Sequence, residues 1–286
     1  MFKNIAFNSE KKLRNGWWML IFFLVLASFL FPLIFLANRF SFEITMTHQA
    51  ILILIASVIC QLLRKDSIAN LVGKINSCWF KELFFGIGIG AVLMALPALV
   101  LTFLGYINWD LNVFSVSTLL SGLALCFSVA LAEELFFRGF LFQRFKDGLG
   151  IWPTQIIIAG LFLLTHINNP GMIGVVKIFA SINIFIASIL FGLVYLKTKS
   201  LAMPIGLHFM ANLTQGTILG FGVSGNTDPS LLLPSFTTSK LWITGGNFGL
   251  EASAIGLFFL VLITLVIYFQ NPTKLDLVLQ KKPVNQ

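Results

Sequence analysis

Six polar side chains stand inside stretches that are otherwise strongly apolar, and together they could hydrolyse an amide bond. They are Glu133, Glu134, Arg138, His166, His208 and Asn212. A carboxylate beside a histidine can take a proton from water and make the water a nucleophile. A histidine or asparagine donor can stabilise the oxyanion of a tetrahedral intermediate. Alternatively, one carboxylate and two histidines, here Glu133, His166 and His208, form a catalytic zinc site with water at the open position. The residue types leave both routes open.

The segment Glu133 to Arg138 is the most informative part of this set. Glu134 and Arg138 are four residues apart, so on a helix they share one face in the order that favours an ion pair. Charged side chains at membrane depth are expensive, and they usually have a functional role. Glu133 points about 100° around the helix from Glu134 and has no comparable partner. We therefore expect Glu133 to be the residue that is free to act as a general base.

The composition predicts the elements that must position these residues. The 286 residues are 57% hydrophobic and only 10% charged, with a mean hydropathy of +0.92. A soluble domain has about 25% charged residues, so the composition predicts an integral membrane protein. The first apolar run, residues 17–37, is too long for a signal-peptide core and has no small-x-small cleavage site after it, so we interpret it as a retained helix.

Apolar runs long enough to span a bilayer occur at eight places in the sequence. They cover residues 17–37, 45–63, 83–105, 115–137, 151–167, 178–196, 201–221 and 251–270. We predict an all-α, polytopic fold with a single membrane domain over residues 1–286. The candidate site residues fall on the fourth, fifth and seventh spans.

The basic residues predict the orientation of the chain. The net charge is +8, and of the 19 Lys and Arg residues all but Arg39, Lys177 and Lys240 fall on one side of the predicted spans. This bias is the positive-inside pattern, which predicts that both termini are cytoplasmic and that the charge is not a nucleic-acid site. We expect a bacterial cell membrane. The predicted boundaries place Glu133 near the cytoplasmic end of its span but His166 near the external end of the next, which conflicts with one shared site.

Other motifs either exclude a chemistry or indicate packing. The chain has no His-Glu-x-x-His, no Gly-x-Ser-x-Gly, and no aspartate within a predicted span, which excludes a two-aspartate intramembrane protease. The three cysteines show no paired spacing and are expected to be packing residues. Gly86 and Gly90 are four residues apart in the third span, a spacing typical of close helix packing.

The order of the polar motifs resembles the CPBP family of intramembrane proteases, which includes the CAAX prenyl endopeptidases and the bacterial Abi proteins. The matching motifs, which span about residues 115–220, are Glu133-Glu134-x-x-x-Arg138, Phe162-x-x-x-His166 and His208-x-x-x-Asn212. Members of this family often carry Phe-x-x-Gly-x-x-x-Gly before the third motif. Here the pattern is Phe185, Ser188 and Gly192, with serine at the first glycine position.

The resemblance implies roles for these positions in the cleavage of a membrane-associated peptide or protein. Glu133 would activate water with help from His166, and His208 and Asn212 would stabilise the oxyanion. Glu134 and Arg138 would shape the site. The resemblance leaves a metal-dependent and a glutamate-dependent mechanism open, so zinc held by Glu133, His166 and His208 stays an alternative.

Two other functions compete with the protease hypothesis. Membership of the Abi branch would also allow a non-catalytic immunity or scaffold protein on the same fold. A transporter could use Glu133, His166 and His208 as a proton relay, but transporters often show internal repeats, and this sequence has none. The sequence does not indicate the substrate or the oligomeric state.

Overall fold

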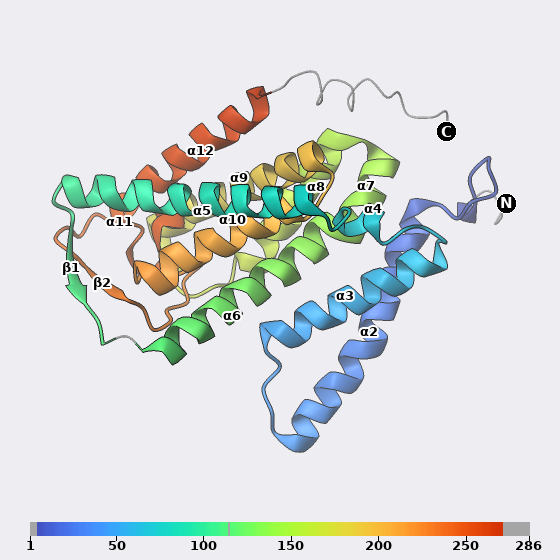
Figure 1. Ribbon diagram of the computed structural model, residues 1–286, viewed down its shortest axis with the longest axis horizontal. Helices are drawn as coiled ribbons and strands as arrows, with labels where there is room; N and C mark the ends of the chain where they lie inside the picture. The colour runs from blue at the N-terminus through green and yellow to red at the C-terminus, as the bar shows by residue number, and fades with distance from the viewer. Residues whose placement is uncertain (1–4, 114, 271–286) are drawn as a thin grey trace.

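Helices make up most of the computed structural model, which describes residues 5–113 and 115–270 (Figure 1). The longer helices are α2 (Asn15–Phe40), α3 (Met46–Leu63), α5 (Ser77–Phe103), α6 (Val116–Glu134), α7 (Leu141–Leu149), α8 (Ile151–His166), α9 (Gly174–Thr198), α10 (Ala202–Asn212) and α12 (Ala254–Phe269). The short elements are α4 (Ala69–Val72), α11 (Leu241–Thr244), the π-helical turns η1 (Leu135–Phe140) and η2 (Leu213–Ile218), and the 3-10 turns η3 (Gly246–Phe248) and η4 (Leu250–Ala252).

Five helical stretches among the described residues are long and apolar enough to cross a membrane. They are Asn15–Phe40, Met46–Leu63, Ala69–Phe103, Val116–Leu149 and Gly174–Thr198. Two further apolar helices, α8 and α12, are shorter, with 16 residues each. The prediction of a mostly helical, polytopic membrane protein is therefore confirmed. Each of the eight predicted spans overlaps a helix, but the count of eight crossings stays a prediction.

The predicted end of the fourth span at residue 137 lies two residues before a sharp bend in the helix. The stretch Val116–Leu149 has 34 residues, and the non-helical φ and ψ angles of Gly139 divide it into a first helix, which contains α6, and a second helix, which contains α7. The charge of Arg138 suggested an end at the membrane surface. In the structure Arg138 is fully buried and pairs with Glu134, so its charge is compensated inside the protein.

A small antiparallel sheet joins two connections that are far apart in the sequence. Strand β1 (Ile107–Leu111) pairs with β2 (Leu232–Phe236), and Ile107 lies opposite Phe236. Five residues with weak alternation do not predict a strand on their own. The sheet closes one end of the molecule, where α5 ends and α6 begins (Figure 1).

Glycines let α5 and α10 approach each other closely. A Cβ atom at Gly86 would meet the backbone of Met203, and one at Gly90 would meet the backbone of Leu207. Gly206 of α10 has the same relation to Leu83 of α5. The predicted packing role of Gly86 and Gly90 therefore holds, and it fixes the helix that carries His208 against α5.

The glycine contact gives a prediction with a matched control in the same helix. Gly90→Ala is expected to destabilise the protein by about 1–3 kcal/mol, because the added methyl group overpacks a backbone contact. A methyl group at Gly88 would meet no heavy atom within 4 Å, so Gly88→Ala is expected to be neutral or slightly stabilising. Unfolding of the purified protein in detergent measures both, and equal stability of the two variants would contradict this account.

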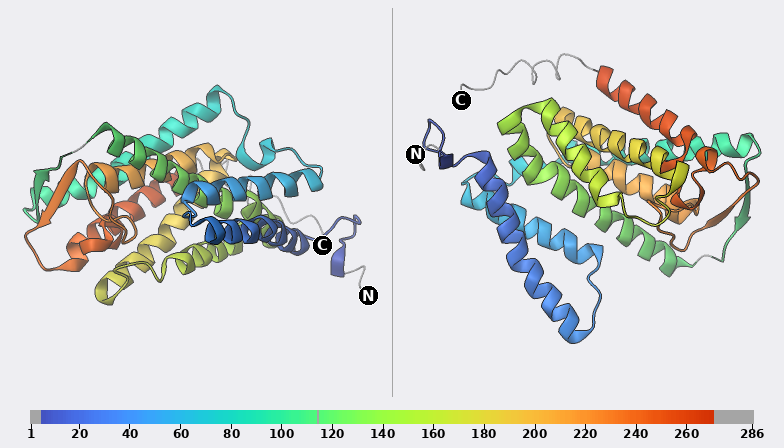
Figure 2. Two further views of the ribbon diagram at one scale, coloured as in Figure 1. Left: turned by 90° about the horizontal axis from the view of Figure 1, so that it is seen from below. Right: turned by 180° about the vertical axis from the view of Figure 1, so that it is seen from behind.

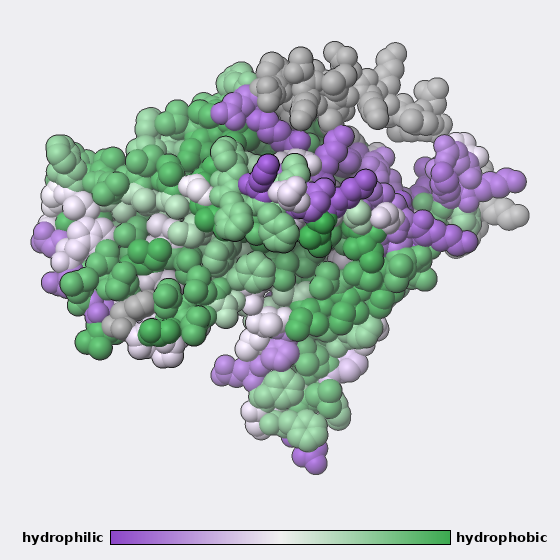
Figure 3. All heavy atoms as spheres, in the orientation of Figure 1, coloured by the Kyte–Doolittle hydropathy of each residue, from purple (hydrophilic) through white to green (hydrophobic). Residues whose placement is uncertain are grey.

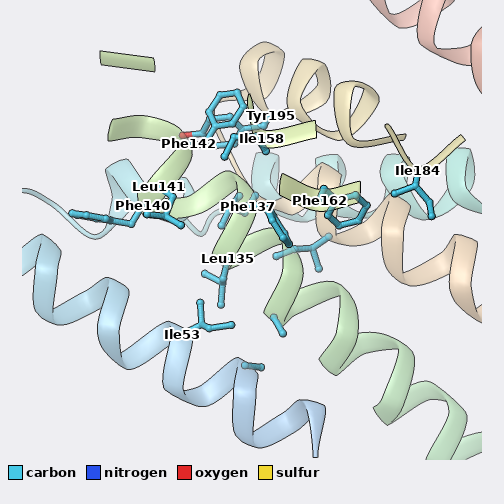
Figure 4. Close-up of a cluster of buried hydrophobic side chains, with 14 of the residues drawn as sticks. Ile53, Leu135, Phe137, Phe140, Leu141, Phe142, Ile158, Phe162, Ile184 and Tyr195 are labelled. Carbon is cyan, nitrogen blue, oxygen red and sulfur yellow. The ribbon is translucent and has the colours of Figure 1, made fainter. Parts of the chain in front are cut away.

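The largest cluster of buried apolar side chains includes residues of η1, α7, α8 and α9 (Figure 4). Phe137 of η1 and Phe162 of α8 meet edge to face, with ring centroids 5.0 Å apart. Phe140 stacks on Phe22 of α2, and Phe142 meets Tyr195 of α9. This cluster joins α6, α8 and α9 into a rigid support for the polar residues beside it.

The α2–α3 hairpin packs on the rest of the molecule through α3, which contacts α6 and η1, and through α2, which contacts α7. Seen from the front and from behind, α2 diverges from α6 towards the loop that connects it to α3 (Figures 1 and 2). At the start of α3, Thr47 hydrogen-bonds to Ser128 of α6 at 2.9 Å.

Candidate functional site

The chain between Glu133 and His166 forms a helical hairpin. Its first arm runs from the end of α6 through α7, its second arm is α8, and the hairpin places Glu133 and His166 close to each other. From Glu133 the chain runs sixteen residues to Leu149, and α8 brings it back over 16 residues to His166. Gly139, with φ −79° and ψ −121°, bends the first arm. Because the two arms are of similar length, the depth conflict of the predicted boundaries disappears.

A fully buried ion pair forms the base of the site. Arg138 Nη1 donates to Glu134 Oε1 at 3.2 Å, and Arg138 Nη2 donates to the hydroxyl and the carbonyl of Ser188 on α9, at 2.8 and 3.1 Å. The guanidinium also lies over the rings of Phe162 and Phe191. The serine at the usual glycine position is thus an acceptor for this arginine.

Gly192, the second small residue of that pattern, has a packing role. A Cβ atom at Gly192 would meet the side-chain amide of Gln155 on α8. The small residue therefore allows α8 and α9 to pack closely around a buried polar side chain.

His208 is held between the two glutamates. Its Nδ1 lies 2.9 Å from Glu134 Oε1, and its Nε2 lies 3.8 Å from Glu133 Oε2. Its ring stacks on Phe191, with centroids 5.0 Å apart and planes 13° apart. Because the Glu134 carboxylate accepts hydrogen bonds, Nδ1 must be a donor. With carboxylates facing both nitrogens, His208 can be a double donor.

His166 approaches Glu133 from the other side. Its Nδ1 donates to the carbonyl oxygen of Phe162 at 2.7 Å, which leaves Nε2 with a lone pair in the neutral ring. That Nε2 lies 4.0 Å from Glu133 Oε1. The two oxygens of Glu133 therefore each face one imidazole.

Glu133 differs from Glu134 in its surroundings. The Glu133 side chain is 19% exposed, whereas that of Glu134 is fully buried. Glu133 Oε2 has no hydrogen-bond partner among the described residues. The distances of 3.8 and 4.0 Å exceed a direct hydrogen bond but suit groups that share a bridging water.

Asn212 completes the sequence-predicted set. It lies one turn after His208 and lines the same cavity of about 420 Å³ as Glu133, His166 and His208. No hydrogen bond to its side chain occurs among residues 5–113 and 115–270, so its amide is available to a bound group. The structure thus brings Glu133, His166, His208 and Asn212 to one cavity.

Glu251 is a further acidic residue of this cavity, and the sequence analysis missed it. It lies in η4 and accepts hydrogen bonds from Gln215 at 3.0 Å and Ser224 at 2.8 Å. Burial raises the pKa of Glu251, and the hydrogen bond from Ser224 opposes this effect. The available signal in the sequence was the charge of Glu251 at the start of an apolar run. Because Glu251 is also the first residue of the last predicted span, its charge was consistent with a simple span boundary.

A second, apolar cleft of about 500 Å³ also reaches Glu133. It lies between the α2–α3 hairpin and the end of α6. Its walls are mostly apolar and include Leu26, Leu30, Ile34, Leu52, Ile53 and Phe136. Glu133 therefore stands between a polar cavity and an apolar one.

The arrangement of Glu133, His166 and His208 does not decide between a metal-dependent and a metal-free mechanism. Within the described ranges, no group of three or more His, Cys, Asp or Glu side chains is positioned to hold a metal. Zinc requires its nitrogen and oxygen ligands at about 2.0–2.2 Å. The zinc alternative with Glu133, His166 and His208 gains no support from the geometry, and no step proposed below uses a metal.

The fold and the site together define a helical integral membrane protein in which two histidines from separate helices face one glutamate, beside a buried Glu–Arg pair. Residues 115–214 match the family model described as type II CAAX prenyl endopeptidase Rce1-like. This match confirms the resemblance to the CAAX protease (CPBP) family and indicates a membrane protease of the CAAX type. No curated protein matches the chain, and neither does any solved structure.

Proposed function

We propose that this protein is an intramembrane endopeptidase in which Glu133 activates water for attack on a peptide bond of a membrane-associated substrate. The observation that carries the proposal is the placement of one partly exposed glutamate between the Nε2 atoms of His166 and His208. The family match over residues 115–214 supports the reaction class.

The geometry allows the two histidines to have different roles in the reaction. His166 Nε2 accepts a hydrogen bond from the water, and Glu133 takes the proton of that water as its oxygen bonds to the carbonyl carbon. His208 Nε2–H and the Asn212 amide donate to the oxyanion. The proton held by Glu133 then moves to the amine nitrogen as the C–N bond breaks, which yields a carboxylic acid and an amine.

The ion pair of Glu134 and Arg138 orients the His208 ring without touching the substrate. Glu134 fixes the ring of His208 through Nδ1, and Arg138 holds the carboxylate of Glu134 in position. An acceptor at Nδ1 determines which nitrogen of a histidine faces the site.

A comparison of peptides from cells that make the wild-type protein or Glu133→Gln tests the proposal. Peptides that end at a new terminus in or beside an apolar segment should appear only with the wild-type protein. Identical peptide sets would contradict the proposal and would favour a scaffold function on the same fold.

Asn212→Ala gives a kinetic test once a substrate from that comparison is used with the reconstituted protein. The loss of one oxyanion donor is expected to lower kcat by about 10²–10³-fold with a smaller effect on KM. Asn38, at an exposed position of α2 and in neither cavity lining, is the matched control, and Asn38→Ala should keep kcat near the wild-type value. Equal kcat for the two variants would remove Asn212 from the mechanism.

A further inference from the structure

The lining of the polar cavity extends to one end of the molecule. Its lining includes Asn169 after α8, Ser224, Asn226 and Asp228 after η2, and Glu251 before α12. These connections lie at the same end as β1 and β2 (Figure 1). The rim therefore consists of amide, hydroxyl and carboxylate groups, which hydrogen-bond to a polypeptide backbone.

The rim is held together by its own hydrogen bonds. Asn169 Nδ2 donates to the carbonyl of Ser224 at 3.0 Å, and Ser224 Oγ donates to Glu251. Gln215 donates to Glu251 and to the carbonyl of Gly222. This network connects the end of α8, the turn after α10 and the start of α12, so the opening is a built feature of the fold.

Most of the described basic residues lie at the opposite end. They occur in the connections between α3 and α5, in α7 and after α9, and they include Arg64, Lys65, Lys74, Arg144, Lys146 and Lys199. Hydrophilic side chains gather over α4, α7 and the start of α2 (Figure 3). Among the described residues that line the cavity there is no lysine or arginine. By the positive-inside rule, the basic end faces the cytoplasm.

We propose that the Glu133 cavity receives its substrate from the side of the membrane opposite the cytoplasm, as a polypeptide segment presented at the extracytoplasmic surface. This inference rests on the proposed function, because it names where the substrate of that reaction enters. The two observations behind it are independent: the cavity rim is at one end, and most of the basic loops are at the other.

Thiol labelling in intact cells tests the proposal without an activity assay. In a variant whose native cysteines are replaced by serine, single cysteines are placed at the rim (Asn226→Cys), inside the cavity (Val129→Cys) and at the basic end (Lys65→Cys). A membrane-impermeant maleimide is expected to label the rim position in intact cells and the Lys65 position only after permeabilisation. A small charged methanethiosulfonate should reach position 129 from outside and not in inside-out vesicles.

The results separate this proposal from the proposed function. Labelling of Lys65→Cys from outside, or of Val129→Cys only in inside-out vesicles, would overturn extracytoplasmic access, even if Glu133→Gln abolishes cleavage. Labelling as expected, together with normal cleavage by Glu133→Gln, would instead overturn the protease proposal and keep the orientation of the cavity.

Discussion

Glu133→Gln is expected to lower kcat by about 10²–10⁴-fold, which is the typical contribution of a positioned general base. Glutamine keeps the shape of the side chain but cannot take a proton from water. The residues around it, His166 and His208, keep their contacts with Phe162 and Glu134. The measurement is cleavage of an identified substrate by the reconstituted protein, with thermal unfolding recorded in parallel.

Glu82→Gln is the control for the loss of a carboxylate. Glu82 lies on α5 and belongs to neither cavity lining. Its variant should cleave at the wild-type rate. A Glu133→Gln protein that is folded and cleaves as fast as Glu82→Gln would show that water is activated by another group.

Arg138→Met is expected to have the largest effect on stability, a loss of about 3–5 kcal/mol, because it leaves the carboxylate of Glu134 buried without its ionic partner. The side chains of Glu134 and Arg138 are both fully inaccessible to solvent. The substitution also removes both hydrogen bonds to Ser188. Unfolding in detergent micelles measures this loss.

The double variant Glu134→Gln/Arg138→Met separates the ion pair from simple packing. Because no unpaired charge remains, the double variant should be more stable than Arg138→Met alone. Lys81→Met, at an exposed position of α5, is the control and should be close to the wild-type protein. If Arg138→Met were as stable as Lys81→Met, the ion pair would not support the site.

The sequence predicted the parts of the site that depend on spacing within one helix. The pair of Glu134 and Arg138, and the common face of His208 and Asn212, follow from the period of an α-helix. The depth of His166 did not follow. It depends on the bend at Gly139 and on where α7 turns into α8, and no spacing within one helix predicts either of them.

The sequence could not predict contacts that form only between distant connections. The partners in the β1–β2 sheet, such as Asn108 and Ser235, are more than a hundred residues apart. Glu251 gains its role from Ser224 and Gln215, which come from a loop and from a π-helical turn. No local period marks such a network, because tertiary packing alone brings its members together.

The position of Glu133 between an apolar cleft and a polar cavity has a consequence for how a cut site would be selected. A chain that leaves hydrocarbon through the cleft and enters water through the cavity crosses that boundary beside Glu133. We expect such an enzyme to select a bond by its distance from the last lipid-embedded residue. The identity of the flanking side chains should then matter little. Shifting the apolar segment of a substrate by one residue should then move the cut by one residue.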